Sequence, residues 1–360
     1  MIYLFIFLIC CILLALSKSS VNSEITEKNN SLTKFSLFIT FLLLWGLAAF
    51  RYNVGIDYKV YSLVHFPRVL AGETGVWEPL STLLVYIGNF IYGYVGIFAL
   101  IHLIILSFLL VAIYDSSENI TFSMSLLFLT GFFNISLNLM RQSIVIAIFL
   151  FSIQYIFKRD FKKYLLFMII AFLFHKTAVF YFPMYFLYNL KFNTKRLCFI
   201  AIMILPVSYL LNFLLNFLTQ YFDVYRNYWG LVEMQASNST SGTLTILNIY
   251  ILLMFFLIRS LSRNITGEIK KKSDLYIYIQ LISLVVIIFS NNFYLPNFDR
   301  ILLLFTATQI ISIPFFFKQK FNTYFKVLLF IFTIIIYCIA FYQLYYLKNT
   351  TGTFPYQTFF

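Results

Sequence analysis

Long apolar runs recur from one end of this chain to the other. They measure about 17–22 residues, and about 20 helical residues cross a hydrocarbon core about 30 Å thick. A segment inside such a core must pair its backbone polar groups internally, as a helix does. Strands of a membrane barrel would alternate apolar and polar residues in segments of about ten, and that pattern is absent. The sequence predicts an all-α, polytopic membrane protein of about 11–13 transmembrane or re-entrant helices.

The composition agrees with a chain that is almost entirely embedded in the membrane. Of its 360 residues, 61% are hydrophobic and 11% are charged, whereas soluble domains carry about 25% charged residues. No internal repeat or linker divides the chain, so we expect one polytopic membrane domain over residues 1–360. The expected spans lie near residues 1–16, 35–50, 96–114, 119–137, 139–157, 197–218, 244–262, 274–290, 300–317 and 327–347.

Basic residues give the chain a formal net charge of +13, and they gather in short loops between the spans. The positive-inside bias and anionic headgroups account for them, and no soluble domain could carry a nucleic-acid face, so we expect no nucleic-acid partner. The basic loops at 158–163 and 191–196 are predicted to be cytoplasmic. The stretch 164–190 between them is then a hairpin with His175 at its outer tip. The segments 138–142, 219–243 and 291–300 follow on the outer side.

The first half of the chain requires one further assumption. The basic loop 17–34 is predicted to be cytoplasmic, which places residues 51–77 outside. Arg141 can lie outside as well only if the short apolar stretch 79–93 does not cross the membrane fully. We therefore expect this stretch to be an interfacial or re-entrant helix that lines a cavity. The alternative is a different orientation of the first spans.

The cysteines and the N-terminal run give no sign of a metal, a cofactor or a cleaved leader. Cys10, Cys11, Cys198 and Cys338 lie inside apolar runs without redox or metal-ligand spacing. Residues 1–16 lack a basic n-region and a clear cleavage site, which predicts a retained first span. We expect neither a required metal nor a cofactor.

Polar residues gather in the run from Arg51 to Tyr61, at the end of an apolar helix. Gly55 permits a turn where the chain leaves the bilayer, and Asp57 and Tyr61 are one helical turn apart, with Tyr58 beside them. A guanidinium suits bidentate phosphate binding, and a carboxylate can act as a base or orient a sugar hydroxyl. The alternative is an interfacial aromatic belt with a headgroup-binding arginine.

A second polar group lies at the start of a later span. Asn138, Arg141 and Gln142 are spaced i, i+3, i+4 and are predicted to share one helical face. A charge at mid-bilayer costs about 2.5–3.5 kcal/mol and generally faces the protein interior or a wet cavity. A snorkelling arginine is the alternative, but the neighbouring amides favour a cavity.

Single ionisable residues mark three more helix boundaries. Glu78 precedes Pro79, where an acid also favours a helix N-terminus through the macrodipole. His175 ends an apolar half-helix, unlike His102, which lies in mid-span and is predicted to be a packing residue. In the second half, Asp299 and Arg300 open a span as an ion pair or a phosphate-facing arginine. Loop 219–243 carries aromatic and polar residues suited to stacking on sugar rings.

Taken in order, these residues resemble the EpsG family of Wzy-like polysaccharide polymerases. The resemblance covers roughly residues 45–190, with Asp299-Arg300 as a later element. It rests on this sequence of motifs: Arg51-x-x-x-Gly55-x-Asp57-Tyr58-x-x-Tyr61, then Glu78, then Asn138-x-x-Arg141-Gln142, then Phe174-His175-Lys176-Thr177-Ala178.

The resemblance implies a GT-C-like helical bundle in the bacterial plasma membrane with its active site on the outer face. Such enzymes transfer a growing glycan from undecaprenyl pyrophosphate to the next lipid-linked repeat unit and so build O-antigen, capsule or exopolysaccharide. Donor, acceptor and membrane lipids are then the expected partners, together with a flippase and a chain-length regulator.

The resemblance also implies roles for the polar residues. An anionic leaving group calls for fixed cations such as Arg141, and Asp57, Glu78 or His175 would serve as the base. These four are the expected catalytic residues. The expected substrate-binding residues are Arg51, Tyr58, Tyr61, Asn138, Gln142, Asp299 and Arg300.

Three other functions compete with this interpretation. A lipid-linked oligosaccharide flippase or transporter would spread its polar residues through the bilayer and onto both faces. An O-antigen ligase would carry a larger outer loop with its own His and Arg residues, and loop 219–243 is modest. A glycan acyltransferase would need paired His and Asp residues that the sequence does not show.

Overall fold

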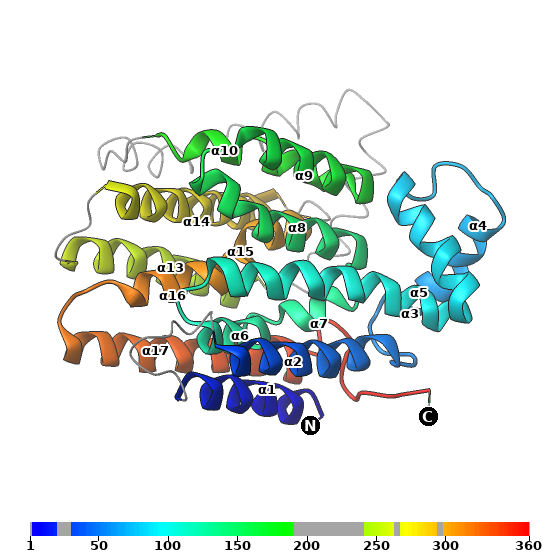
Figure 1. Cartoon of the computed structure of the whole chain (residues 1–360), viewed down its shortest axis with the longest axis horizontal. Coiled ribbons are helices and arrows are strands. Elements are labelled where there is room, and N and C mark those ends of the chain that lie inside the picture. The colour runs from blue at the N-terminus through cyan, green and yellow to red at the C-terminus, as the bar shows by residue number, and fades with distance from the viewer. Residues whose placement is uncertain (1, 20–29, 191–240, 263–266, 294–297, 360) are drawn as a thin grey trace. The chain divides into compact units, whose positions relative to one another are not determined.

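The computed structural model describes residues 2–19, 30–190, 241–262, 267–293 and 298–359 (Figure 1). These residues form helices without a β-strand, apart from one isolated bridge between Arg51 and Thr358. Seven of the described helices are long and apolar enough to cross a membrane, and two apolar helices are shorter. The predicted all-α, polytopic membrane fold is thus confirmed, whereas the expected span 197–218 lies outside the described residues.

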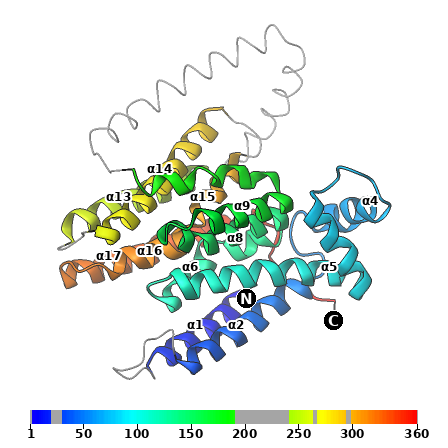
Figure 2. The same ribbon diagram turned by 45° about the horizontal axis from the view of Figure 1, so that its top comes forward.

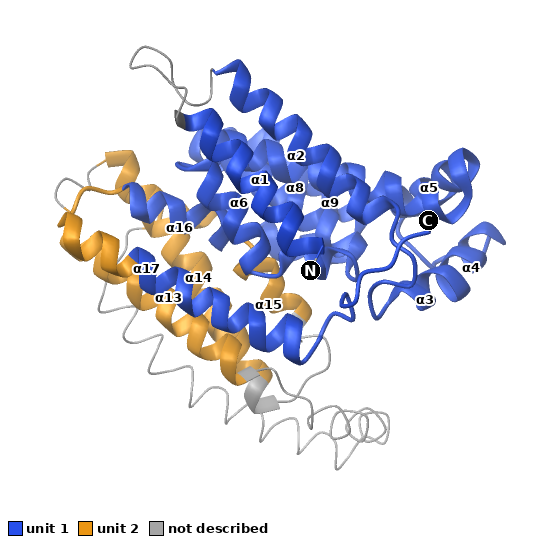
Figure 3. Ribbon diagram, turned by 90° about the horizontal axis from the view of Figure 1, so that it is seen from below, with its two compact units in different colours: residues 1–185, 309–318, 330–360 blue, residues 186–308, 319–329 orange. Residues whose placement is uncertain are grey.

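The chain divides into two compact units (Figure 3). The first comprises residues 1–185, 309–318 and 330–360, and the second comprises residues 186–308 and 319–329. This division does not test the expectation of a single polytopic domain over residues 1–360, which stays a prediction.

A bundle of apolar helices forms most of the first unit. In Figures 1 and 2, α8 lies between α5 and α9, and α5 also packs on α2. Every residue from 142 to 150 in α8 is buried, as expected for a core helix that is apolar on all sides. The bounds of these helices are α1 (Ile2–Ser19), α2 (Ser31–Ala49), α5 (Pro79–Ser116), α6 (Ile120–Leu129), α8 (Met140–Phe157) and α9 (Phe161–Phe174).

Local sequence signals explain where several of these helices begin. The side chains of Asn30, Asn119 and Asp160 accept hydrogen bonds from backbone N–H groups in the first turns of α2, α6 and α9. Such caps satisfy N–H groups that have no partner inside the helix. Pro79 opens α5, where its fixed φ and missing N–H cost nothing.

Helix α5 is two arms joined by a reversal. Tyr92 and Gly93 leave helical geometry, and Gly93 has a φ of +57°. A Cβ at Gly88 would lie 2.5 Å from the Ile97 Cα, and Gly96 packs against the Gly88 backbone. In a continuous helix residues 88 and 96 would be about 12 Å apart. Residues 79–91 therefore fold back on residues 94–116 as a separate short helix. The expectation that this stretch does not cross the membrane fully stays a prediction.

A bent helical segment precedes this reversal. It runs through α3 (Tyr58–Val60), the π-helical η2 (Tyr61–His65) and α4 (Phe66–Leu70). Its inner side buries Tyr58, Tyr61, Phe66 and Val69. The Tyr86 hydroxyl donates to the Val69 carbonyl at 2.8 Å and so ties α4 to the first arm of α5.

Two predicted spans are interrupted. The span expected at 119–137 divides into α6 and α7 (Phe132–Ser136) because Gly131 adopts a φ of +72°, and the Tyr345 ring occupies the space of a Cβ. The span expected at 300–317 divides into α15 (Phe298–Thr306) and α16 (Gln309–Lys318). The apolar composition of each run contained no signal strong enough to show these breaks.

The predicted break at His175 is confirmed. Helix α9 ends at Phe174, and His175 is extended, with φ of −162° and ψ of 136°. The chain continues as a 3₁₀-helix, η3 (Lys176–Tyr181), and then α10 (Met184–Leu187), so the second half of this stretch is shorter and less regular than the first.

In the second unit, α14 (Gly267–Phe293) packs against both α13 (Ser241–Leu261) and α15. Buried Gln280 and Ser283 on α14 both donate to the Asn248 side-chain oxygen on α13, at 2.9 and 2.8 Å. Helix α17 (Thr323–Phe341) begins in the second unit, but its residues from 330 onward belong to the first unit. The π-helical η4 (Tyr342–Leu347) and an irregular segment to residue 359 follow there.

Candidate functional site

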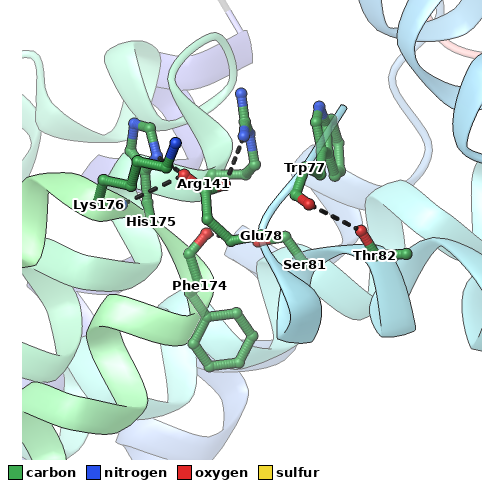
Figure 4. Close-up of polar contacts among 8 residues, drawn as sticks. All are labelled: Trp77, Glu78, Ser81, Thr82, Arg141, Phe174, His175 and Lys176. Atoms are coloured by element: carbon green, nitrogen blue, oxygen red, sulfur yellow. Dashed lines mark hydrogen bonds and ion pairs between the residues drawn. The ribbon is translucent and has the colours of Figure 1, made fainter. Parts of the chain in front are cut away.

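Three of the predicted catalytic residues meet at the carboxylate of Glu78 (Figure 4). Arg141 Nη1 lies 2.6 Å from Glu78 Oε2, and His175 Nδ1 lies 2.7 Å from Glu78 Oε1. The backbone N–H of Lys176 also donates to Oε1, at 3.2 Å. Residues 63 and 97 positions apart in the sequence thus form one cluster.

Each member of the cluster stands at the end of a helix in the first unit. Glu78 has an extended conformation just before α5, and its side chain does not cap that helix. Arg141 lies in the first turn of α8, and His175 is the extended residue after α9. The Ser81 hydroxyl donates to the Phe174 carbonyl at 2.7 Å, which holds the start of α5 against the end of α9 (Figure 4). Three helix ends therefore fix the cluster.

The surroundings of Glu78 hold its carboxyl in the ionised form. Burial alone would raise its pKa, but the hydrogen bond from His175, the charge of Arg141 and a backbone hydrogen bond outweigh burial and lower the pKa to about 2. The Glu78 side chain is 10% exposed, against 20% for Arg141 and 23% for His175. The cluster is thus partly open, with the carboxylate as its most enclosed part.

The contact with Glu78 also orients the His175 ring. A carboxylate can only accept, so a neutral imidazole bonded to it carries its proton on Nδ1. The second ring nitrogen, Nε2, then presents a lone pair. This is the geometry in which a carboxylate prepares a histidine to take a proton.

An aromatic wall lies beside Arg141. The guanidinium stacks on the Trp77 ring at 4.7 Å from its centroid. The rings of Tyr61, His65 and Phe66 surround Trp77, with centroids 5.7, 6.0 and 5.7 Å away. Sequence reasoning missed Trp77 and His65, although the position of Trp77 next to Glu78 was an available signal.

His65 lies near the charges of Arg141, Arg68 and Asp57. Burial, followed by the charges of Arg141 and Arg68, lowers its pKa, while Asp57 acts in the opposite direction. Its Nδ1 atom is buried and has no hydrogen-bond partner among the described residues. His65 is therefore a second imidazole near Arg141, and its surroundings favour the uncharged form.

The turn at Gly55 positions Asp57, and Asn138 holds this turn. Gly55 has a φ of +103°, in the region that favours glycine, and the predicted turn at this position is confirmed. The Asn138 side-chain oxygen accepts from the Asp57 N–H at 3.1 Å, and a Cβ on Gly55 would lie 2.6 Å from that oxygen. The prediction that Asn138 shares a helical face with Arg141 is wrong, because α8 begins at Met140 and Asn138 lies in the turn before it.

A C-terminal segment, residues 349–359, completes this turn and was not foreseen from the sequence. Asn138 Nδ2 donates to the Thr351 carbonyl at 2.8 Å. The N–H groups of Gly55 and Ile56 donate to the carbonyls of Gly352 and Thr351, at 3.0 and 3.1 Å. Asn138 therefore joins the turn before Asp57 to a segment more than two hundred residues away.

Arg51 lies in the protein interior. Its side chain is 0% exposed, it stacks on Phe98 at 4.6 Å, and Nη2 contacts the Met140 sulfur at 3.3 Å. Burial lowers its pKa to about 10, against the opposing effect of nearby tyrosines. Atoms Nε and Nη1 have no partner among the described residues. The structure thus separates Arg51 from solvent, and its role in phosphate binding stays a prediction.

The remaining predicted residues of the first unit are buried around these two arginines. Tyr58 is 6% exposed and stacks on Phe98 at 5.0 Å, and Tyr61, also 6% exposed, contacts the Trp77 ring. Gln142 is 3% exposed at the start of α8. Their expected contacts with sugars or phosphates stay predictions.

Asp299 and Arg300 belong to α15 in the second unit. Arg300 is exposed, and the Asp299 side chain lies outside the described part of the structure. Most of the expected sugar-binding loop 219–243 lies outside it as well. The structure therefore does not join these predicted residues to the Glu78 cluster.

The described residues offer no cluster of metal ligands. In the described ranges no three His, Cys, Asp or Glu side chains gather closely enough to hold a metal ion.

Comparison with known proteins adds to this geometry. None of the curated proteins and none of the solved structures matches the chain. A family model does match, over residues 34–358, and its description is the EpsG family. The match includes every residue of the cluster and extends through the C-terminal segment that pairs with the Gly55 turn. Because it covers most of the chain, it confirms the resemblance inferred from the ordered motifs, and the chain belongs to the EpsG family.

Proposed function

We propose that this protein is a glycosyltransferase that polymerises lipid-linked oligosaccharide repeat units at the outer face of the bacterial plasma membrane. Membership of the EpsG family supports a polysaccharide polymerase-like role. The observation that carries the proposal is the cluster of Glu78, Arg141 and His175, which places an oriented imidazole beside a cation. Undecaprenyl pyrophosphate is the proposed carrier of both donor and acceptor.

The reaction joins an acceptor hydroxyl to the anomeric carbon of the donor glycan. As the new C–O bond forms, the bond from that carbon to the pyrophosphate oxygen breaks, and its electron pair leaves with the pyrophosphate. The hydroxyl proton passes to Nε2 of His175. Glu78, bonded to Nδ1, stabilises the imidazolium that results.

Arg141 stabilises the negative charge that develops on the leaving pyrophosphate. A guanidinium has five N–H donors, so its bond to Glu78 leaves donors for phosphate oxygens. The Trp77 ring under the guanidinium fixes its plane. Arg141 would thus bind the leaving group without losing its contact with Glu78.

The environment of Glu78 distinguishes its role from that of a base. A carboxyl with a pKa of about 2 is a weak proton acceptor at neutral pH. We therefore assign proton transfer to His175 and orientation to Glu78. Asp57, whose backbone is held by Asn138, is assigned to the positioning of sugar hydroxyls.

The test is polymerisation by the purified protein in liposomes that contain lipid-linked repeat units. Wild type should build a glycan ladder, and His175→Ala should reduce the rate by about 10²–10⁴, the usual contribution of a general base. Glu78→Gln and Arg141→Lys should also reduce the rate strongly. The Arg68–Glu73 pair, with the same 2.6 Å contact but about half exposed, provides the control variants Arg68→Lys and Glu73→Gln.

The result separates this proposal from its rivals. Transfer of unpolymerised units across the bilayer by wild type, without a ladder, would indicate a flippase. Transfer of a finished glycan to a lipid A core acceptor would indicate a ligase. A wild-type ladder that His175→Ala builds at the normal rate would remove His175 from the mechanism.

A further inference from the structure

The first arm of α5, residues 79–91, carries an exposed apolar stripe. Leu83, Ile87, Phe90 and Ile91 are 49%, 41%, 90% and 62% exposed. Their spacing of i, i+4, i+7 and i+8 places them on one face of a helix. This arm reverses at Gly93, so its apolar face belongs to a short helix about 20 Å long.

The opposite face of the arm is fixed to the protein. Ser81 is bonded to the end of α9, and Leu84 and Val85 are buried. Gly88 packs against the backbone of Ile97 so closely that even a Cβ would not fit. The arm therefore cannot rotate to bury its stripe, which stays directed away from the bundle.

The stripe begins at the end of the arm that follows Glu78. Leu83 is little more than one helical turn after Glu78, the residue that precedes the arm. Arg141 and the exposed Lys176 place two positive charges at that end. A molecule with an anionic head at these cations and a long apolar chain would find its chain beside the stripe.

We propose that the face formed by Leu83, Ile87, Phe90 and Ile91 binds the isoprenoid chain of the lipid-linked substrate while its pyrophosphate lies at Arg141 and Lys176. This inference rests on the proposed function. A phospholipid also has an anionic head and apolar chains, but its headgroup is not the pyrophosphate that leaves in the reaction proposed for the cluster. A substrate fixed there by its pyrophosphate has its chain leave the site at the end where the stripe begins.

Chain length provides a kinetic test. The variants Leu83→Ser and Ile87→Ser should raise KM for a substrate with a long polyprenyl chain by about tenfold, because each removes an apolar contact. KM for the same glycan on a short, water-soluble isoprenoid pyrophosphate should not change. Phe38→Ser on α2, at a position 56% exposed, is the matched control for an ordinary apolar surface. Equal effects on the long and short substrates would overturn the inference.

Photo-crosslinking tests binding without turnover. A benzophenone amino acid at Ile87 should capture radiolabelled polyprenyl pyrophosphate in preference to the surrounding phospholipid, and the same group at Phe38 should show no such preference. The same ratio of adducts at both positions would refute a substrate-binding face. Specific capture at Ile87 by a protein that builds no ladder would instead refute the proposed function and leave the lipid site standing.

Discussion

Glu78 shows how one side chain can organise a site. Its two oxygens serve a guanidinium and an imidazole, and a backbone N–H adds a third contact. Removal of one member of a largely buried ionic cluster leaves the others without compensation. Glu78 is therefore expected to stabilise the fold as well as the geometry of the reaction.

Lower pH should remove the stabilising effect of Glu78. Its pKa is about 2 in the folded protein, against an ordinary value of 4.5. A carboxyl with a depressed folded pKa stabilises the protein above its unfolded pKa, and this effect is lost as pH falls from 4.5 towards 2. The thermal stabilities of wild type and Glu78→Gln in detergent should differ at pH 7 and should converge as the pH approaches 2. A difference that grows with acidity would contradict the assigned contacts.

Gly55→Ala should both destabilise the protein and impair activity. The φ of +103° is unfavourable for alanine, and the new Cβ would meet the Asn138 oxygen. We expect a loss of about 1–3 kcal/mol in unfolding free energy, measured by denaturation in detergent, and a displaced Asp57. Gly75→Ala is the control, because Gly75 has a φ of +77° but open space around it. Equal losses in the two variants would show that Asn138 does not restrict position 55.

The convergence of these residues was only partly predictable. The sequence singled out Glu78, Arg141 and His175 because each polar residue interrupts an apolar run. It gave no reason to pair them, since contacts between residues 97 positions apart depend on how whole helices pack. The order of motifs characteristic of the family supplied the grouping that local patterns lacked.

At the scale of elements, the reversal in α5 does most to shape the site. It returns the first arm to the bundle, so that the residue before this arm, Glu78, meets the ends of α8 and α9. The basic loops, together with an outer position for Arg141, predicted that residues 79–93 would not cross the membrane fully. The tight packing of Gly88 on Gly96 was not predicted. Glycines are common in apolar helices, and the sequence does not show which backbone each of them packs against.

Gly88→Ala should loosen this reversal. The added Cβ would lie 2.5 Å from the Ile97 Cα, so a backbone must shift, at a cost of about 1–3 kcal/mol. Gly46 lies in the middle of α2, and an added Cβ there would meet no atom within 4 Å. Gly46→Ala should therefore stabilise the protein by about 0.5–1 kcal/mol, because alanine favours a helix more than glycine does. Denaturation in detergent measures both changes in unfolding free energy. The rate of polymerisation should fall only in Gly88→Ala. A stabilised Gly88→Ala variant would contradict the close packing of Gly88 on Ile97.

At the scale of the molecule, the predicted topology places the Glu78 cluster on the outer face. Helix α8 has Arg141 in its first turn and the basic loop 158–163 at its other end, about 27 Å away. Thr74 lies in the loop just before Trp77, and the Trp77 ring stacks on Arg141. This loop therefore lies at the end of α8 that carries Arg141. The two ends of α8 should then face opposite sides of the membrane.

Cysteine labelling in intact cells tests this orientation. In a chain whose four native cysteines are replaced by alanine, Thr74→Cys should react with an impermeant maleimide added from outside. Lys162→Cys, also exposed, should react only after the membrane is permeabilised. The reverse pattern would place the cluster on the cytoplasmic side and remove the proposed polymerisation at the outer face.

The class of fold was the most predictable property of the chain. Uninterrupted apolar runs in a lipid solvent leave few choices other than helices, so the polytopic helical fold followed from hydropathy alone. Breaks such as Gly131 were not predictable, because they depend on distant partners such as the Tyr345 ring. The pairing of the C-terminal segment with the Gly55 turn escaped sequence reasoning for the same reason.

That pairing sets an order of events during synthesis. The Tyr356 hydroxyl bonds to the Leu47 carbonyl across 309 positions, and Arg51 and Thr358 form the isolated bridge. A ribosome adds about 5–20 residues per second, so the turn before Asp57 remains without these partners for about 15–60 seconds after it is made. A nascent chain already inserted in the membrane would therefore contain the turn before Asp57 without the hydrogen bonds that hold it in the folded protein. Transfer of glycans would start only when residues 349–359 had been made and had paired with this turn.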